Sequence, residues 1–199
     1  MPFIRNKPTA VPLSGADIQD GTIALADLSA TGTKDATTFL RGDNTFASAG
    51  GTNTPSFMAY LNGNQTISDA TTTKVNLNAE QFDTDNAFDS STNYRFTVPS
   101  GQAGKYLISF YVEGYSSGAS QLISVEGEIR KNGTKYHRVR IDMSNNYGFL
   151  IPVSASVIID LAVSDYIELW GKVDGSSGTT VFVGDADTQC FMNGYKIIE

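Results

Sequence analysis

The sequence is poor in cysteine and histidine, and this scarcity excludes several classes of site. It contains one cysteine, Cys190, and one histidine, His137. A single cysteine cannot form a disulfide within the chain, and a transition-metal site normally needs several cysteine or histidine ligands. We therefore expect neither a disulfide framework nor a zinc site.

Charge is also scarce, and its balance is acidic. Charged residues make up 18% of the 199 residues, with Lys+Arg 14 against Asp+Glu 21 and a formal net charge of −7. Ordinary globular domains are roughly 25% charged. An acidic chain cannot neutralise a phosphate backbone, so nucleic acid is not expected as a partner. Serine, threonine, asparagine and glycine are abundant in place of charged residues, as is typical of β-rich proteins.

Long apolar runs are missing as well. The most apolar stretch lies near residues 157–163 and is interrupted by Asp160. A membrane-spanning helix needs roughly 20 apolar residues, and a secretory signal needs an apolar run after its charged start. Neither is found, so we expect no membrane insertion, and synthesis in a cytoplasm.

The pattern along the chain divides it into two unlike parts. Residues 1–55 carry single, scattered apolar side chains with neither helical nor strand periodicity. Such a segment buries too little surface to fold alone, which predicts an extended stalk and linker. Residues 56–199 instead show short alternating strands separated by turn residues, which predicts one all-β sandwich domain.

Individual strands can be placed in the second part. Residues 123–130 alternate apolar or small residues with polar ones, which predicts one buried and one solvated face. Asn132-Gly133 predicts a tight hairpin turn into a return strand over residues 136–143. Further strands are predicted near residues 157–163, 167–173 and 181–183. Residues 106–112 and 191–198 are apolar on both faces, so one cover is expected to be another subunit.

The strand region resembles the globular head domain of complement component one-q. The resemblance lies in Asn76-Leu-Asn-Ala-Glu-Gln-Phe-Asp83, Tyr94-Arg-Phe-Thr-Val-Pro99, Gly104-Lys-Tyr-Leu-Ile-Ser-Phe110, Leu161-Ala-Val-Ser-Asp-Tyr-Ile-Glu-Leu169 and Phe191-Met-Asn-Gly-Tyr-Lys-Ile197. It implies an antiparallel jelly-roll sandwich, similar to tumour necrosis factor, that assembles as a homotrimer. The residues it assigns to the fold and the trimer contact are Phe96, Tyr106, Phe110, Phe191, Gly194 and Tyr195.

The first part resembles the linkers of tailed-bacteriophage fibre proteins. The matching segments are Asp20-Gly-Thr-Ile-Ala-Leu-Ala-Asp-Leu-Ser-Ala-Thr-Gly32 and Ala36-Thr-Thr-Phe-Leu-Arg-Gly-Asp-Asn-Thr-Phe46. This resemblance implies attachment to a virion. The apolar and basic residues at the N-terminus suit docking as an extended strand on a more acidic virion surface. These anchor candidates are Phe3, Ile4, Arg5 and Lys7.

Other candidate sites have weaker patterns. Oxygen-rich loops can bind calcium, and the candidate ligands are Asp83, Asp85, Asp89, Asp185 and Asp187. These runs lack the spacing of an EF-hand, so solvated turns are the preferred interpretation. His137 and Cys190 have no partners at catalytic spacing and are interpreted as structural. Arg41-Gly42-Asp43 lies inside the fibre-linker match, which disfavours integrin binding. Aromatic residues such as Tyr94 and Trp170 could stack on sugars, although core or subunit contact is the default.

Together these patterns predict a non-enzymatic protein of the virion surface of a tailed phage. Residues 1–55 would bind other capsid or tail proteins, and residues 56–199 would form a trimeric knob for adhesion to a host-surface glycan or protein. No cofactor is expected, apart from possible calcium. Two alternatives stay open: a tail enzyme that degrades glycans, and a secreted complement-like signalling ligand.

Overall fold

The computed structural model describes residues 29–48, 53–117, 122–143, 148–185 and 189–197. The chain divides into two compact units, Met1–Gly51 and Thr52–Glu199. Every helix or strand among the described residues is a β-strand, as the all-β prediction requires. The domain boundary predicted after residue 55 lies between this division and the first strand of the second unit, which begins at Ser56.

In the first unit, the described residues contain a small hairpin that the sequence analysis did not predict. Strands β1 (Thr38–Leu40) and β2 (Phe46–Ser48) pair antiparallel. The Asp43 carboxylate holds the turn by accepting hydrogen bonds from the backbone N and the Oγ1 of Thr45, at 3.1 and 2.6 Å. The turn therefore depends on polar side chains and not on an apolar period. Residues 1–28 of the predicted stalk lie outside the described residues.

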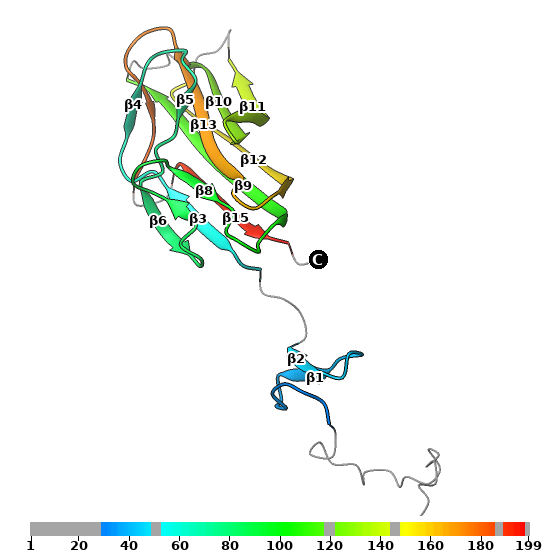
Figure 1. Cartoon of the computed structure of the whole chain (residues 1–199). Helices are drawn as coiled ribbons and strands as arrows, with labels where there is room; N and C mark the ends of the chain where they lie inside the picture. The colour runs from blue at the N-terminus through cyan, green and yellow to red at the C-terminus, as the bar shows by residue number, and fades with distance from the viewer. Residues whose placement is uncertain (1–28, 49–52, 118–121, 144–147, 186–188, 198–199) are drawn as a thin grey trace, which may run out of the picture. The chain divides into compact units, whose positions relative to one another are not determined.

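The second unit is a sandwich of two antiparallel sheets (Figure 1). Among the described residues, the front sheet has seven strands: β4 (Gln65–Ile67), β14 (Thr180–Phe182), β9 (Gly104–Ser116), β15 (Phe191–Lys196), β3 (Ser56–Tyr60) and β6 (Ala79–Asp83) in this order, with β12 (Leu150–Leu161) paired to β9. In the same part of the chain, the back sheet has six: β11 (Thr134–Asp142), β10 (Leu122–Lys131), β13 (Tyr166–Gly175), β8 (Arg95–Thr97) and β7 (Phe88–Asp89), with β5 (Thr73–Lys74) paired to β13. Sheet neighbours are therefore mostly distant in sequence, as in a jelly roll.

The hairpin between β10 and β11 confirms the predicted Asn-Gly turn. Asn132 and Gly133 have φ values of 51° and 77°, and Lys131 pairs with Thr134 across the turn. The predicted solvated face of β10 is wrong. Glu126 and Glu128 point outward but are only 6% and 1% exposed, because arginines and lysines of the same and the neighbouring strands pair with them.

Strand β12 begins seven residues before the predicted strand at residue 157. Pro152 and the serines of its first half interrupt the apolar pattern from which strands were predicted. Pairing with β9 nevertheless runs along its whole length, from Leu150 opposite Tyr115 to Leu161 opposite Gly104. A proline is tolerated here because, among the described strands, β12 pairs with β9 alone and so forms an edge.

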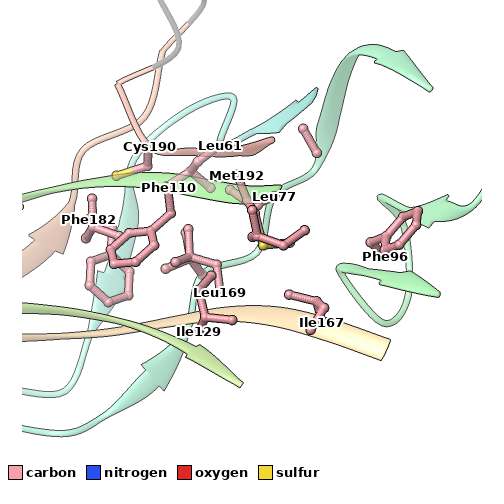
Figure 2. Packing of buried hydrophobic residues seen from close by; sticks show 14 of the residues in the cluster. Leu61, Leu77, Phe96, Phe110, Ile129, Ile167, Leu169, Phe182, Cys190 and Met192 are labelled. Carbon is pink, nitrogen blue, oxygen red and sulfur yellow. The ribbon is translucent and has the colours of Figure 1, made fainter. Parts of the chain in front are cut away.

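The core lies between the two sheets and is rich in aromatic rings. Phe57 of the front sheet stacks on Phe96 of the back sheet, with ring centroids 4.5 Å apart. Figure 2 shows Phe110, Ile129 and Leu169 packed in the same layer. Burying a large apolar side chain contributes about 2 kcal/mol, so this layer holds the sheets together and fixes which strand faces point outward.

Candidate functional site

The outward side of the front sheet carries an exposed apolar surface. Leu107 on β9 lies opposite Tyr195 on β15, and Tyr111 stacks in parallel on Phe191 with centroids 5.9 Å apart. Tyr195 and, on β6, Phe82 are 38% and 47% exposed. We call this surface the front face, and define it by Met58, Phe82, Leu107, Tyr111, Phe191 and Tyr195. Exposed apolar patches of this kind mark contact sites for other molecules.

Small polar side chains cross the middle of the front face. Ser109 and Ser156 share a hydrogen bond between their hydroxyls at 2.7 Å, and Asn193 lies opposite Ser109 on the other neighbouring strand. The small side chains leave a depression of ≈ 310 Å³ that Leu107 and Tyr195 also line. The front face is therefore hollowed in its centre, with apolar side chains on its borders.

A second apolar surface follows the edge where β11 and β12 meet. Its members are Tyr136, Ile141, Leu150 and Ile158, which are 49%, 40%, 41% and 58% exposed. The Tyr136 hydroxyl donates to the backbone O of Ile158 at 3.2 Å and so ties the two sheets together at this edge. We call these four residues the edge patch. Ile158 lies opposite Leu107, so the edge patch continues the front face around the side of the sandwich.

The outward side of the back sheet is covered by ion pairs between glutamates and cationic side chains. Glu126 contacts Arg138, Arg140 and Lys172 at 3.4, 3.4 and 3.3 Å. Similarly, Glu128 pairs with Arg130 and Lys135, and Glu168 pairs with Lys74. The ring of Trp170 lies between the cations of Lys74 and Arg130, at 5.6 and 3.9 Å from its centroid. This side is polar and internally satisfied, unlike the front face.

The residues that the sequence analysis assigned to fold and trimer contact separate into two groups. Phe96, Tyr106 and Phe110 are at most 2% exposed and belong to the core. Gly194 also faces inward, since a Cβ built on it would lie 2.5 Å from Cδ1 of Ile108. Phe191 and Tyr195 belong to the front face. Their role in a trimer stays a prediction. Leu107 and Tyr111 lie in the strand predicted to be apolar on both faces. The analysis missed Met58 and Phe82, although strand alternation with the buried residues could have indicated them.

Two of the calcium candidates, Asp83 and Asp89, hold turns together. Asp89 accepts hydrogen bonds from the backbone N of Ser91, Thr92 and Asn93 at 3.0, 2.9 and 3.1 Å. These donors, with the Asn93 side chain, lower the pKa of Asp89 far below its ordinary value. Asp83 accepts from the backbone N of Phe88 at 2.7 Å. Both carboxylates are therefore engaged by the backbone.

No group of three or more histidine, cysteine or acidic residues within the described ranges is placed to hold a metal ion. The hydroxyl of Thr84 donates to Asp85 at 2.6 Å. Asp185 is described, whereas Asp187 lies outside the described residues. Calcium binding by these five aspartates stays a prediction. The anchor candidates Phe3, Ile4, Arg5 and Lys7 also lie outside them. The described part of the chain contains no helix long and apolar enough to cross a membrane.

The lone cysteine is buried behind the front sheet. Burial raises the pKa of the Cys190 thiol to about 12. Its Sγ accepts a hydrogen bond from the backbone N of Glu113 at 3.2 Å. Burial likewise raises the pKa of the Glu113 carboxyl, with a smaller contribution from Asp185. His137 lies on β11 opposite Ile129. The thiol is thus a protonated packing group, which is the structural role expected for it.

Comparison with known proteins identifies the fold. A solved structure of the globular domain of zebrafish complement 1qA protein matches with a TM-score of 0.50 and 15% sequence identity, covering 72% of this chain and 97% of that chain. The structure of Eiger TNF from S. frugiperda matches with a TM-score of 0.48 and 9% identity, covering 71% of this chain and 91% of that chain. No protein-family model matches the chain, and neither does any curated protein. The predicted jelly-roll sandwich is therefore confirmed.

Proposed function

We propose that this chain, whose second unit has the fold of the complement one-q globular domain, is a homotrimeric structural protein of a tailed-phage virion. In this proposal the second unit is a non-enzymatic knob on the virion surface that adheres to the host. The segment before it is the stalk, anchored to capsid or tail proteins by its N-terminal residues. The size of the chain fits a head fibre that decorates the capsid or a short tail fibre.

The observation that carries the trimer is the pair of different apolar surfaces on one chain. The front face and the edge patch are both exposed, and the edge patch continues the front face at Ile158. A contact between the front face of one subunit and the edge patch of the next joins unlike surfaces. Such a heterologous contact closes into a ring when the rotation allows it. A three-membered ring is the assembly that the complement one-q resemblance implies.

The proposed role in the virion is supported by features of the first unit. The residues of its fibre-linker resemblance, 36–46, form the β1–β2 hairpin, which exposes Phe39 and Leu40 to 61% and 47%. An isolated two-stranded hairpin is only marginally stable in water. These side chains therefore favour a partner, either the other two stalks or a virion protein. Three weakly bound anchors on one trimer would hold by avidity.

A secreted signalling ligand is the second candidate, and the likeness to the complement globular domain favours it as much as it favours a knob. The two roles differ in where the protein is found. Mass spectrometry of purified phage particles, with immunogold labelling, is expected to detect the chain on head or tail. Detection only in particle-free medium would support the signalling ligand and contradict the virion role.

The assembly is tested by light scattering on the full chain. We expect three times the 21.3 kDa mass of one chain at micromolar concentration. Leu107→Arg places a charge in the front face, where it cannot be paired on burial, and should give folded monomers. Thr97→Arg adds the same charge on β8 in the back sheet and should stay trimeric. A monomeric wild type, or a trimeric Leu107→Arg, would contradict the proposed interface.

A further inference from the structure

A depression on the second unit is lined mainly by amide side chains. It has a volume of ≈ 260 Å³, and its lining residues are Leu61, Asn62, Gly63, Asn64, Gln65, Asn76, Asn78 and Tyr94. They come from the segments that follow β3 and β5, from the first residue of β4 and from the residue before β8. The described residues that line it include no charged side chain. We call it the amide pocket. It shares no residue with the front face or the edge patch. The subunit contacts of the proposed trimer would therefore not involve its lining residues.

Two of the amides fix the walls of the amide pocket. Asn78 accepts a hydrogen bond from the backbone N of Asn62 at 2.7 Å and donates to its backbone O at 3.3 Å. The side chain of Gln65 accepts from the backbone N of Asn76 at 2.9 Å. Segments far apart in sequence are thereby held in one arrangement. Fixing the wall before a ligand arrives reduces the entropy lost on binding.

The remaining polar groups of the amide pocket are little used by the described residues. Among these residues, the side-chain amides of Asn62 and Asn76 and the hydroxyl of Tyr94 make no hydrogen bond. Within the same part of the chain, Asn64 uses its side-chain oxygen alone, which accepts from the backbone N of Gly184 at 3.0 Å. The pocket therefore offers both donors and acceptors, from fixed backbone positions, to a ligand.

Tyr94 adds an aromatic ring in a strained backbone conformation. Its φ is 49°, in the left-handed region that bulky residues rarely occupy. Glycine or asparagine would adopt this conformation at lower cost. A tyrosine here is therefore a structural outlier at the rim of a polar depression, and such outliers concentrate at binding sites.

We propose that the amide pocket binds one neutral sugar residue of a surface glycan. An amide presents a donor and an acceptor side by side, which matches adjacent hydroxyl groups of a sugar ring. An aromatic ring can cover the apolar face of the same ring, since tyrosine combines a broad apolar surface with a polar tip. The pocket is smaller than the roughly 300–1,000 Å³ of drug-sized sites, which fits a single ring. The inference rests on the proposed role of the knob in host adhesion.

The experiment uses the full-length chain and saturation-transfer NMR titrations. The probes are glucose, galactose and N-acetylglucosamine, with glucuronic acid as the charged comparison. We expect saturable binding of at least one neutral sugar in the millimolar range and weaker binding of glucuronic acid. Tyr94→Gly removes the ring while suiting the backbone. It should weaken binding roughly tenfold without loss of thermal stability.

Asn62→Ala removes an unused amide and should also weaken binding. Asn53→Ala, an exposed amide outside the pocket, is the matched control and should bind as the wild type does. Absence of neutral-sugar binding, preference for glucuronic acid, or binding that Tyr94→Gly and Asn62→Ala leave unchanged would overturn the sugar site. Light scattering on the same samples reports assembly separately. A trimer that binds no sugar refutes only the pocket, whereas a monomer that binds sugar refutes only the assembly.

Discussion

Three glutamates on the back sheet, Glu126, Glu128 and Glu168, are nearly as buried as the apolar core. Each is at most 6% exposed, yet each lies on the outward side of its strand. The arginines and lysines that pair with them are themselves only 17–49% exposed, and they lie on adjacent strands except Arg130, which shares β10 with Glu128. The cost of removing a carboxylate from water is offset here by two or three cations or by a hydrogen bond from Trp170. The pairs therefore depend on one another.

Glu128→Gln should destabilise the second unit by about 2 kcal/mol, because it leaves Arg130 and Lys135 without their buried counter-charge. Urea unfolding followed by tryptophan fluorescence measures the change. Asp142→Asn alters a pair with Arg140 in which both side chains are at least 35% exposed. This control should change stability by less than about 0.5 kcal/mol. Equal losses in the two variants would contradict the burial argument.

Asp165 predicts a pH dependence at the turn between β12 and β13. Hydrogen bonds from Lys131, Asn132 and the backbone N of Ala162 lower its pKa from 3.8 to about 2. The pKa of Asp165 is lower in the folded than in the unfolded protein. Its carboxylate therefore contributes fully to the free energy of unfolding above about pH 4, and this contribution disappears as the pH falls to about 2. Asp165→Asn should therefore be less stable than the wild type at pH 6 and nearly equal to it at pH 2. A stability difference that is independent of pH would contradict this.

Polar turns and apolar strand faces specify different parts of the fold. The β10–β11 hairpin is fixed locally, by two residues whose φ values are positive. The pairing of β9 with β12, β14 and β15 is fixed at long range, by the apolar faces that these strands bury against the back sheet. Local turns set the register, and burial selects the partners.

Gly133→Ala tests whether the turn residues fix the β10–β11 hairpin locally. The φ of Gly133 is 77°, and a Cβ there would approach only the Tyr166 hydroxyl, at 3.5 Å. Space is available, so the cost is backbone strain of about 1 kcal/mol. Thermal or urea unfolding should show this loss with no change in the assembly state. Unchanged stability would mean that the turn relaxes into another type.

Much of the strand pattern could be predicted from the sequence. Period-two alternation and the Asn-Gly turn located β10, β11 and β13, and the resemblance supplied the jelly-roll topology. Alternation cannot say how far a neighbouring side chain extends, which is why the burial of Glu126 and Glu128 was missed. Strand β12 was too short in the prediction because Pro152 and the serines beside it conceal an edge strand.

The candidate site was harder to predict. Strand residues with apolar side chains on both faces indicated a second cover, and the structure assigns Leu107 and Tyr111 to the outward side. Of the amide pocket, only Tyr94 was indicated, as an aromatic side chain that could stack on a sugar. Asn62 and Asn76 are ordinary turn residues until the fold brings their segments together. The proximity of these segments depends on long-range strand pairing, which produces no periodic pattern in the sequence.

At the scale of the whole molecule, the two units differ in what stabilises them. The second unit has a continuous core of aromatic and aliphatic side chains, whereas the first has a short hairpin with few buried residues among those described. The second unit should therefore fold without the first. The first is expected to depend on contacts made by the assembled protein.

Removal of residues 1–55 tests this independence. The remaining chain should show the near-ultraviolet circular dichroism and the thermal midpoint of the full chain's knob, and it should stay trimeric by light scattering. It should no longer join phage particles, because the proposed anchor is gone. Loss of folding would place essential contacts in the deleted segment, and retained incorporation into particles would contradict the anchor.

The burial of Cys190 gives the molecule a built-in reporter of opening. The thiol is 0% exposed, and burial raises its pKa to about 12, so a thiol-specific reagent finds neither access nor thiolate in the closed state. Labelling must wait until Cys190 and β15 leave the front sheet. The labelling rate in native buffer then measures the free energy of that opening. If the front face is covered by a neighbouring subunit, dilution to monomers should accelerate labelling.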